Sequence, residues 1–263
     1  MPEVLEVESY RRLAEGVVGA RVARGFADAY AAAKLPSTRA WAAATRGRTV
    51  TGTARRGKLL VLTTDGPDLG LRFGMTGVLL LEGTAGITGL FYGPHGYQER
   101  WIRAGLELAD GRRLLLHDPR RLARVELDPD LDALGPDVLS LRAAQFAQAL
   151  ASRGPGPAIK ARLLDQSRLA GVGNLLADEA LFRAGLDPRT PVGRLDAASR
   201  ARLLRALRAT LRTLERRGGS HTGDHQEARH REGRCPRDGT PLAHGVVGGR
   251  STYWCPLHQV VPG

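Results

Sequence analysis

The sequence predicts an α+β protein in which a β-rich first half is followed by a helical second half and a small C-terminal module. Three observations support this fold class. Short apolar runs separated by turn signals dominate the first half, and apolar residues at helical spacing dominate the second. Two pairs of potential metal ligands then mark the tail, which is too short to build a hydrophobic core of its own.

Short apolar runs at 59–62, 78–81 and 114–116 alternate with turn signals such as Asp65-Gly66 and Asp110-Gly111. This pattern is typical of antiparallel strands joined by tight turns. One helix is expected before them, because apolar residues recur at near-helical spacing directly after Pro2, which is tolerated at a helix start. These apolar residues are Val4, Val7, Tyr10 and Leu13.

The second half changes to helical spacing after the stretch from Asp128 to Ser140, whose Asp and Pro content indicates a linker. The expected helices lie at about 142–152, 158–169, 175–185 and 196–216. The last one carries an apolar stripe and a separate basic stripe, which is usually a solvated helix face. The apolar stripe consists of Leu203, Leu207, Leu211 and Leu214, and the basic stripe of Arg205, Arg208, Arg212 and Arg216.

The composition of the 263-residue chain is ordinary for a globular protein, with 42% hydrophobic and 25% charged residues. This composition excludes a wholly disordered, collagen-like or disulfide-scaffold chain. The longest stretch without charge covers only 16 residues, from Gly83 to Gln98, so no membrane span is expected. Glu3 and Glu6 interrupt any signal-peptide pattern, and two cysteines argue against a disulfide framework, so we expect a cytoplasmic protein.

The net charge of +12 and the sequence pI of about 10.8 are the unusual quantities. A basic protein of this size most often binds a polyanion, with nucleic acid as the first candidate and an acidic membrane surface as the second. Lysine occurs only at Lys34, Lys58 and Lys160, so nearly all basic residues are arginine. Because codon bias also produces arginine-rich chains, only the sign of the charge is informative.

The C-terminal tail carries the clearest physical signal. Two residues separate Cys235 from Asp238, two separate Cys255 from His258, and 16 residues lie between the two pairs. This spacing is typical of a small module that builds a tetrahedral zinc site, in which the ion replaces a core. Asp238 is an unusual ligand beside thiolates, and His244 is an alternative ligand. A degenerate finger that folds without metal, with two free thiols, is the competing interpretation.

Two shorter patterns each have a functional and a structural interpretation. Gly171-Val-Gly-Asn174 lies between two expected helices, where a helix N-terminus can bind a phosphate, although a helical corner also needs glycine for packing. Once Met1 is removed, Pro2 exposes a secondary amine, a nucleophile toward aldehydes, beside the carboxylic acid of Glu3. Proline at this position otherwise marks only a helix start.

Seven short motifs together carry a resemblance to a known family. In chain order they are Pro2-Glu-Val-Leu-Glu-Val-Glu8, Arg56-Gly-Lys58, Gly74-Met-Thr-Gly77, Asp118-Pro-Arg-Arg121, Leu164-Asp-Gln166, Gly171-Val-Gly-Asn174 with Ala177-Asp-Glu179, and Gly249-Arg-Ser-Thr252. With these motifs in order, the chain resembles the formamidopyrimidine-DNA glycosylase/endonuclease VIII family of base-excision repair enzymes from Pro2 to Gln259. The motif around Met75 and the double arginine favour the formamidopyrimidine branch.

The resemblance implies an N-terminal antiparallel β-sandwich over residues 1–128, a helical domain with a helix–two-turn–helix motif over 137–225, and a β-hairpin zinc finger over 229–263. It further implies that DNA binds in the cleft between the domains. We therefore expect a monomer that binds damaged double-stranded DNA and no membrane. The resemblance also implies one structural zinc ion, held by Cys235, Asp238, Cys255 and His258.

The same resemblance assigns expected roles to individual residues. Pro2 matches the family nucleophile, which attacks C1′ of the damaged nucleotide and forms a Schiff base. Glu3 matches the carboxylate that assists opening of the sugar ring, with Glu6 as a supporting acid. Lys58 is expected to hold a phosphate within the catalytic site. The remaining expected DNA contacts are Asn174 and Arg250 at flanking phosphates, Met75 and Arg120 in the gap left by the everted base, and Arg121, Leu122 and Lys160.

Several positions depart from the family pattern. Leu5 replaces the usual proline, and Leu122 stands at the wedge position where phenylalanine is common. Asp238 and His258 replace two cysteines. Only 15 residues separate Gly219 from Cys235, which is short for a family loop that covers the everted base. Whether this chain shares the family's usual preference for oxidised guanine is therefore left open.

The leading hypothesis is a bifunctional DNA glycosylase and AP lyase that removes oxidised or ring-opened bases and cleaves the strand by β,δ-elimination. Two alternatives stay open. One is an enzyme of the same chemistry that acts mainly on abasic sites, oxidised pyrimidines or bulky adducts, and the other is a non-catalytic DNA-binding protein. The presence of Pro2, Glu3 and Lys58 favours an enzyme, because simple DNA binding needs no N-terminal amine beside an acid.

Overall fold

The computed structural model describes residues 2–87 and 96–262, which form two compact units divided between Leu131 and Asp132. This division falls inside the stretch expected as a linker. From residue 128 to residue 137 the chain is irregular, and a short 3₁₀ helix, Val138–Ser140, follows. The other 3₁₀ helices are Glu15–Val17, Glu99–Trp101, Val192–Arg194 and Ser220–Thr222.

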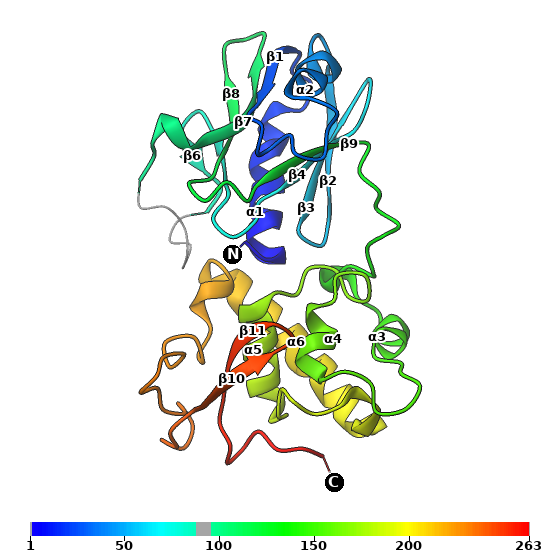
Figure 1. Cartoon of the computed structure of the whole chain (residues 1–263), viewed down its shortest axis with the longest axis vertical. Helices are drawn as coiled ribbons and strands as arrows, with labels where there is room; N and C mark the ends of the chain where they lie inside the picture. The colour runs from blue at the N-terminus through cyan, green and yellow to red at the C-terminus, as the bar shows by residue number, and fades with distance from the viewer. Residues whose placement is uncertain (1, 88–95, 263) are drawn as a thin grey trace. The chain divides into compact units, whose positions relative to one another are not determined.

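Two antiparallel sheets make up most of the first unit (Figure 1). One has the strand order β1-β7-β8-β5-β6, and the other has the order β2-β3-β4-β9. The apolar runs at 59–62, 78–81 and 114–116 lie in β3, β5 and β8, so their prediction as strands is confirmed. The strands are β1 (Val22–Ala27), β2 (Val50–Arg56), β3 (Leu59–Thr64), β4 (Leu69–Arg72), β5 (Val78–Leu81), β6 (Thr84–Ala85), β7 (Ile102–Leu108), β8 (Arg113–His117) and β9 (Arg124–Leu127).

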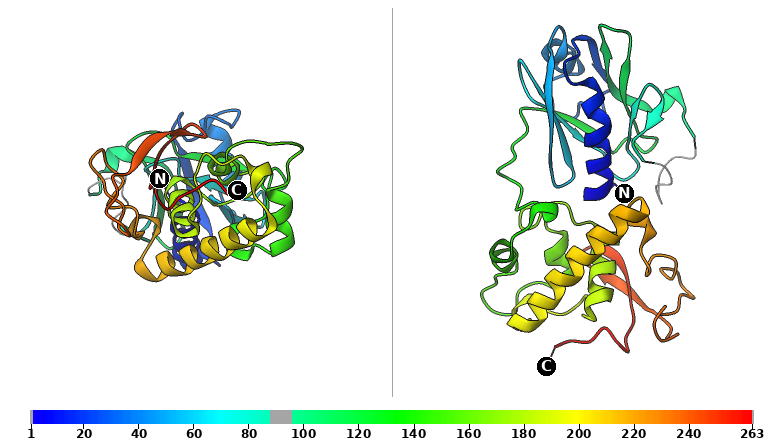
Figure 2. Two further views of the ribbon diagram at one scale, coloured as in Figure 1. Left: turned by 90° about the horizontal axis from the view of Figure 1, so that it is seen from below. Right: turned by 180° about the vertical axis from the view of Figure 1, so that it is seen from behind.

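Helix α1 (Val4–Ala14) packs into the core of the first unit, where it contacts β2 and β3 of one sheet and β5 of the other (Figure 2). Its predicted helical spacing is confirmed, because Val4, Val7 and Tyr10 are fully buried. The Tyr10 hydroxyl donates a hydrogen bond to the Gly77 carbonyl (3.2 Å). Contacts with both sheets hold α1, and therefore its N-terminus, in a defined place within this unit.

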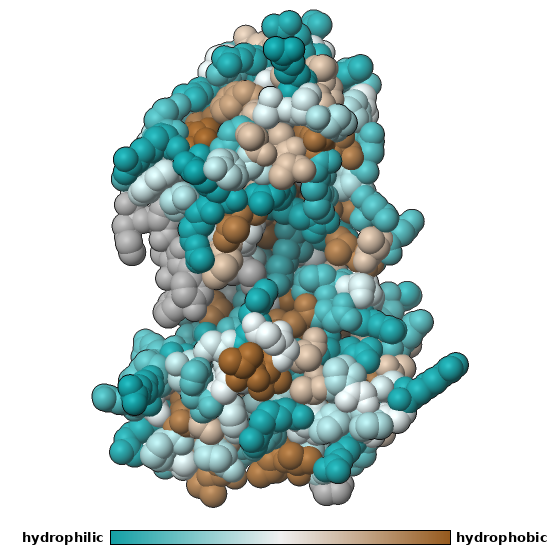
Figure 3. Space-filling model, in the orientation of Figure 1, coloured by the Kyte–Doolittle hydropathy of each residue, from teal (hydrophilic) through white to brown (hydrophobic). Residues whose placement is uncertain are grey.

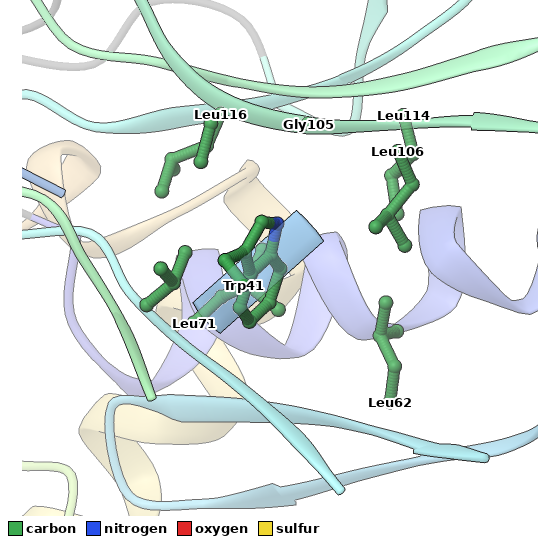
Figure 4. A pocket seen from close by; sticks show the side chains of 9 residues that line it. Trp41, Leu62, Leu71, Gly105, Leu106, Leu114 and Leu116 are labelled. Carbon is green, nitrogen blue, oxygen red and sulfur yellow. The ribbon is translucent and has the colours of Figure 1, made fainter. Parts of the chain in front are cut away.

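Helix α2 (Thr38–Thr45) packs against β1 and inserts Trp41 into the same core. A small cavity of about 10 Å³ lies beside the Trp41 ring (Figure 4). Its other lining residues include Leu62, Leu71, Leu106 and Leu114. A cavity of this size has room for about one water molecule, so it is too small to be a substrate pocket.

Four helices build the second unit: α3 (Ala143–Ala149), α4 (Ile159–Leu164), α5 (Asn174–Ala184) and α6 (Ala197–Arg217). All four predicted helices form, but the segment 158–169 is helical only as far as Leu164. Asp165 accepts hydrogen bonds from the backbone N–H and the hydroxyl of Ser167. Gln166 donates to the carbonyls of Leu164 and Val172. These local side-chain bonds stabilise a turn where the apolar spacing predicted more helix.

The remaining strands, β10 (Ala243–Val247) and β11 (Arg250–Trp254), form an antiparallel hairpin. Gly248 and Gly249 make its two-residue turn with φ of +60° and +71°, a conformation that favours glycine. A Cβ atom on Gly248 would lie 2.9 Å from the Cα of Ala161, so the hairpin tip packs directly on α4. Strand β11 also contacts α5, which packs against α6.

Hydrophilic side chains cover most of the face of the protein drawn in Figure 3, with smaller apolar areas between them. This pattern is ordinary for a folded chain whose apolar residues form internal cores. Among residues 2–87 and 96–262, no helix combines the length and hydrophobicity that crossing a bilayer requires.

Candidate functional site

The first residues of the chain are buried at the start of α1. Pro2 is buried, and Glu3, the N-cap residue of the helix, has no exposed surface. The Glu3 backbone N–H donates a hydrogen bond to the Glu6 carboxylate (2.8 Å) in a capping-box arrangement. This bond fixes the backbone that carries Pro2. Met1, whose removal the nucleophile hypothesis requires, lies outside the described residues.

Lys58 lies half-buried in the turn between β2 and β3, directly after Gly57, whose φ is +58°. Arg55 ties this turn to α1, because it donates to Glu8 Oε2 (2.9 Å) and to the Gly57 carbonyl (3.0 Å). Burial alone would raise the pKa of Glu8, but hydrogen bonds from Arg11 and Arg55 outweigh it and lower the pKa. The sequence alone does not single out Arg55, because its role depends on α1 packing against β2.

Met75 and the segment Arg120–Leu122 lie on two loops of the first unit that touch each other. Gly74 has φ of +58°, and a Cβ atom there would lie 2.6 Å from Leu122 Cβ. Met75 is half-buried, whereas all three residues of the segment 120–122 are exposed, and Leu122 retains 38% exposure. An exposed leucine beside two arginines offers an apolar wedge within a cationic surface.

A buried carboxylate organises these two loops. Asp118 has no exposed surface. It accepts hydrogen bonds from the backbone N–H groups of Arg120 (3.1 Å), Leu122 (2.6 Å) and Ala123 (2.7 Å) and from the Thr76 hydroxyl. One side chain therefore sets the path of the 120–123 backbone and joins it to the Met75 loop. Asp118 belongs to a sequence motif, but its role could not be predicted from the sequence because its partners depend on how the loop folds back.

Arg121 is held on the surface by an aromatic neighbour. Its guanidinium lies 4.7 Å from the centroid of the Tyr30 ring and donates a hydrogen bond to the Tyr30 hydroxyl (3.1 Å). This contact orients Arg121 beside the exposed Leu122.

In the second unit, Asn174 and Arg250 are brought together by the hairpin. Asn174 is the first residue of α5, and its Nδ2 donates to the carbonyl of Ser251 (3.1 Å). Arg250 is the residue before Ser251 in β11 and is exposed. The start of α5, where the helix dipole is positive, is therefore bonded to the residue next to an exposed arginine in the chain, and both features suit a phosphate group.

Lys160 does not lie on the surface, which corrects its expected role as a direct DNA contact. Its side chain is fully buried, with Nζ 2.6 Å from Asp178 Oδ1. The ammonium group donates to Thr252 Oγ1 (2.6 Å) and to the Ser251 carbonyl (3.2 Å), so it supports the hairpin from beneath. Arg229 pairs with the other Asp178 oxygen (2.9 Å). A buried ammonium needs such a counter-charge, and the sequence spacing did not show that Asp178 supplies it.

The loop that follows α6 is attached to α5 through a second buried carboxylate. Glu179 has no exposed surface and accepts hydrogen bonds from the backbone N–H groups of Asp224 (3.2 Å) and His225 (2.9 Å). Arg183 binds both Glu179 (3.1 Å) and Asp224 (2.9 Å), and Arg217 also pairs with Asp224. The middle of this short loop is therefore fixed against the helix.

The four predicted metal ligands converge in the second unit. The ligand atoms of Cys235, Asp238, Cys255 and His258 all lie within 4.8 Å of one another. His258 Nδ1 is 3.4 Å from Cys235 Sγ and 3.3 Å from Asp238 Oδ2. The two cysteines are buried and pack around Phe182, and they form no disulfide. Two thiols, one imidazole nitrogen and one carboxylate are the donors that a tetrahedral metal ion accepts.

His244, the alternative ligand, lies elsewhere on the hairpin. Its Nε2 is 3.0 Å from the Ser251 hydroxyl, and its ring stacks on Tyr253 with centroids 4.4 Å apart. The group that could hold a metal therefore contains Asp238 rather than His244.

Comparison with known proteins identifies the family of the chain. Residues 1–125 match the family model of the formamidopyrimidine-DNA glycosylase N-terminal domain, and residues 134–225 match that of the formamidopyrimidine-DNA glycosylase H2TH domain. Together these two domains define a DNA glycosylase of base-excision repair. The chain belongs to the formamidopyrimidine-DNA glycosylase family, whose activity includes an AP lyase step, as the resemblance predicted.

Individual relatives support the same assignment over the full chain. The formamidopyrimidine-DNA glycosylase of Rhodopseudomonas palustris (strain TIE-1) is 34% identical, covering 98% of this chain and 100% of the relative. The enzyme of that name from Thermus thermophilus is 36% identical, with 98% of each chain covered. Among solved structures, the LlFpg protein in complex with a THF-DNA and an inhibitor is similar at a TM-score of 0.80 and 26% identity, covering 98% of this chain and 100% of that one.

Proposed function

We propose that this DNA glycosylase uses the N-terminal amine of Pro2 as its nucleophile on damaged double-stranded DNA. The observation that carries the proposal is the buried pair of Pro2 and Glu3 at the start of α1, whose backbone is held by Glu6. After removal of Met1, an α-amino group with a pKa of roughly 7.7–8.0 has an appreciable neutral fraction near pH 7. A lysine, with a pKa near about 10.4, would need a large shift to act equally well.

The proposed reaction forms a bond between the Pro2 nitrogen and C1′ as the bond from C1′ to the damaged base breaks. Glu3 donates a proton to the ring oxygen or to the departing base. The C1′–O4′ bond then breaks, with O4′ taking a proton and the Pro2 nitrogen losing one, which opens the sugar ring and leaves an iminium ion between Pro2 and C1′. This iminium ion acidifies the adjacent C2′ proton, and loss of that proton expels the 3′ phosphate. A second elimination releases the 5′ phosphate, and water then frees the amine from the sugar fragment.

The DNA contacts proposed for this reaction follow from exposure and charge. Lys58, Asn174 and Arg250 bind phosphates flanking the lesion, supported by their positions at a strand turn, a helix start and a hairpin tip. Met75, Arg120 and Leu122 fill the gap left by the everted base, with Arg121 beside them on the duplex. Lys160 acts as a positioning residue, since its ammonium group donates to the Ser251 carbonyl and the Thr252 hydroxyl rather than to DNA.

We also propose that residues 229–263 form a zinc finger within a three-part organisation whose other parts are residues 1–128 and 137–225. Cys235, Asp238, Cys255 and His258 fit one Zn²⁺ ion as a complete donor set, so the ion would be structural, with no open position for an activated water. It would join the chain before β10 to the chain after β11. Elemental analysis should find one zinc per chain, and zinc-free protein that still binds duplex DNA would contradict this.

The lesion class is proposed to be oxidised or ring-opened bases, and one observation favours a second candidate. The loop after α6 is short and is fixed to α5 by Glu179 and Asp224. A loop held in this way is poorly suited to fold over a large everted base. The second candidate is therefore an enzyme that acts mainly on abasic sites, oxidised pyrimidines or bulky adducts.

The test is borohydride trapping on a panel of duplexes that carry these lesions one at a time. Mass spectrometry of the trapped adduct should place the DNA on Pro2, and the relative yields should rank the lesions. Pro2→Gly retains an amine and should lose much of the rate, whereas protein that retains Met1 should form no adduct. An adduct on Lys58, or no adduct on any lesion, would refute Pro2 as the nucleophile.

A further inference from the structure

Helix α6 carries a basic face that the proposed function does not use. Arg205, Arg212 and Arg216 are exposed, and their spacing of seven and four residues places them on one side of the helix. None of the three forms a salt bridge with an acidic side chain within residues 2–87 and 96–262. Arg208, at the edge of this side, instead donates to the Leu141 carbonyl (2.8 Å).

The basic face is directed away from the hairpin. The opposite side of α6 is buried through Leu203, Leu207, Leu211 and Leu214, and α6 packs against α5. The β11 strand also contacts α5, and the front and rear views show α5 between the hairpin and α6 (Figures 1 and 2). Arg205, Arg212 and Arg216 are therefore on a different side of the second unit from Arg250.

The chemistry of this face favours a nucleic acid over other polyanions. Ala209 and Thr213 lie between the arginines, the exposed Glu215 lies beside Arg216, and α6 exposes no large apolar side chain. The face therefore lacks the apolar residues that insert into a membrane interface and the aromatic anchors that dominate protein interfaces. Arginine forks match phosphate oxygens. The row from Arg205 to Arg216 spans about 16 Å of helix, a length over which one DNA strand presents about five phosphates.

We propose that Arg205, Arg212 and Arg216 form a second DNA-binding face, which binds the phosphates of an undamaged duplex while the lesion site holds another duplex. The protein would then bridge two DNA segments. Such a contact reads no base sequence, because phosphates carry none. It would allow transfer from one segment to another during the search for damage.

The test uses the full-length protein, a donor-labelled duplex with an abasic-site analogue and an acceptor-labelled undamaged duplex, at low salt. Energy transfer between the labels reports bridging. The triple variant R205Q/R212Q/R216Q should reduce bridging by about tenfold. The slope of log affinity for the undamaged duplex against log salt concentration should become shallower by about two to three, because three phosphate contacts are lost. The matched control, R24Q/R46Q/R153Q, removes the same charge from scattered exposed positions and should bridge like the wild type.

Binding of the lesion duplex alone is measured separately, and the triple variant should retain it within about twofold. If the wild-type protein does not bind the lesion duplex, the proposed function is rejected. If the wild-type protein binds the lesion duplex but does not bridge two duplexes, only the second DNA-binding face is rejected. Unchanged bridging in the triple variant, or an equal loss in the control, would also overturn it. Arginine-dependent binding to phosphatidylserine vesicles that exceeds binding to duplex DNA would assign the face to membranes instead.

Discussion

At the scale of single residues, buried carboxylates organise the surfaces that the proposed function uses. Asp118 accepts hydrogen bonds from the backbone of residues 122 and 123, in the loop that carries Leu122. Asp178 pairs with Lys160 beneath the hairpin, and Glu179 holds the loop after α6. A buried charge is tolerated only where ion pairs or hydrogen bonds compensate its loss of water. These acids therefore act on DNA recognition through the backbone and the cations that they position.

Glu3→Gln tests the role of the buried acid beside Pro2. Glutamine keeps the size of the side chain but cannot donate a proton as a carboxylic acid does, so base excision should fall by about 10²–10⁴-fold. Cleavage of a pre-formed abasic site should fall much less, because its base has already left. Single-turnover rates on both substrates measure the difference. Glu15→Gln, an exposed acid at the other end of α1, is the control, and equal losses on both substrates would argue against an acid role for Glu3.

His117 provides a prediction for pH. Burial lowers the pKa of this side chain, and its Nε2 accepts a hydrogen bond from the Gln98 backbone N–H (3.2 Å). Between the lowered pKa and the ordinary value near 6.5, the unfolded chain binds more protons than the folded chain. The free energy of unfolding should therefore fall as the pH drops below about 6.5.

His117→Gln removes this titration while it keeps a carbonyl acceptor for Gln98. Urea unfolding at pH 7.5 and at pH 5 should show a smaller loss of stability in the variant than in the wild type. Identical pH dependence in the two proteins would show that His117 contributes nothing to acid sensitivity.

At the scale of elements, the loop that carries Met75 and the loop that carries Leu122 pack closely against each other at Gly74. Gly74→Ala would add a Cβ atom 2.6 Å from Leu122 Cβ, at a φ of +58°. Gly83→Ala in the β5–β6 turn has a φ of +74° but meets nothing within 4 Å, so it is a matched control for backbone strain alone. We expect Gly74→Ala to destabilise the protein by about 1–3 kcal/mol more than Gly83→Ala, because its added atom overpacks the loop contact.

Denaturant unfolding measures this difference, and excision from a lesion duplex measures its functional effect. Movement of Leu122 should lower excision in Gly74→Ala but leave Gly83→Ala close to the wild type. Equal effects of the two substitutions would show that the contact between the loops does not set the position of Leu122.

At the scale of the whole molecule, the charge of +12 makes DNA affinity depend on salt. Arg250→Ala should weaken binding of damaged and undamaged duplexes by similar factors, since a phosphate contact carries no sequence information. It should also reduce the log–log salt slope by about 0.9, the contribution of one phosphate contact. Fluorescence anisotropy titrations at several salt concentrations test this, with Arg24→Ala as a surface control. Unchanged affinity at every salt concentration would remove the hairpin tip from the DNA interface.

The amino-acid sequence alone predicted the features that depend on residue spacing along the chain. Local patterns in the sequence are enough to predict such features. They include the apolar period of α1, the apolar runs in β3, β5 and β8, and the two ligand pairs that begin at Cys235 and Cys255. The motifs from Pro2 to Thr252 likewise identified the family before any contact was known.

Contacts between side chains that are distant in the sequence became known only from the fold. It ended α4 at Leu164, buried Lys160 against Asp178, placed Asp238 rather than His244 among the metal ligands, and assigned Arg55 and Asp118 their partners. The physical reason is that burial and charge pairing depend on residues brought together from distant parts of the chain. Local period and spacing describe the backbone of an element, whereas the environment of a charged group is set by the path of the whole fold.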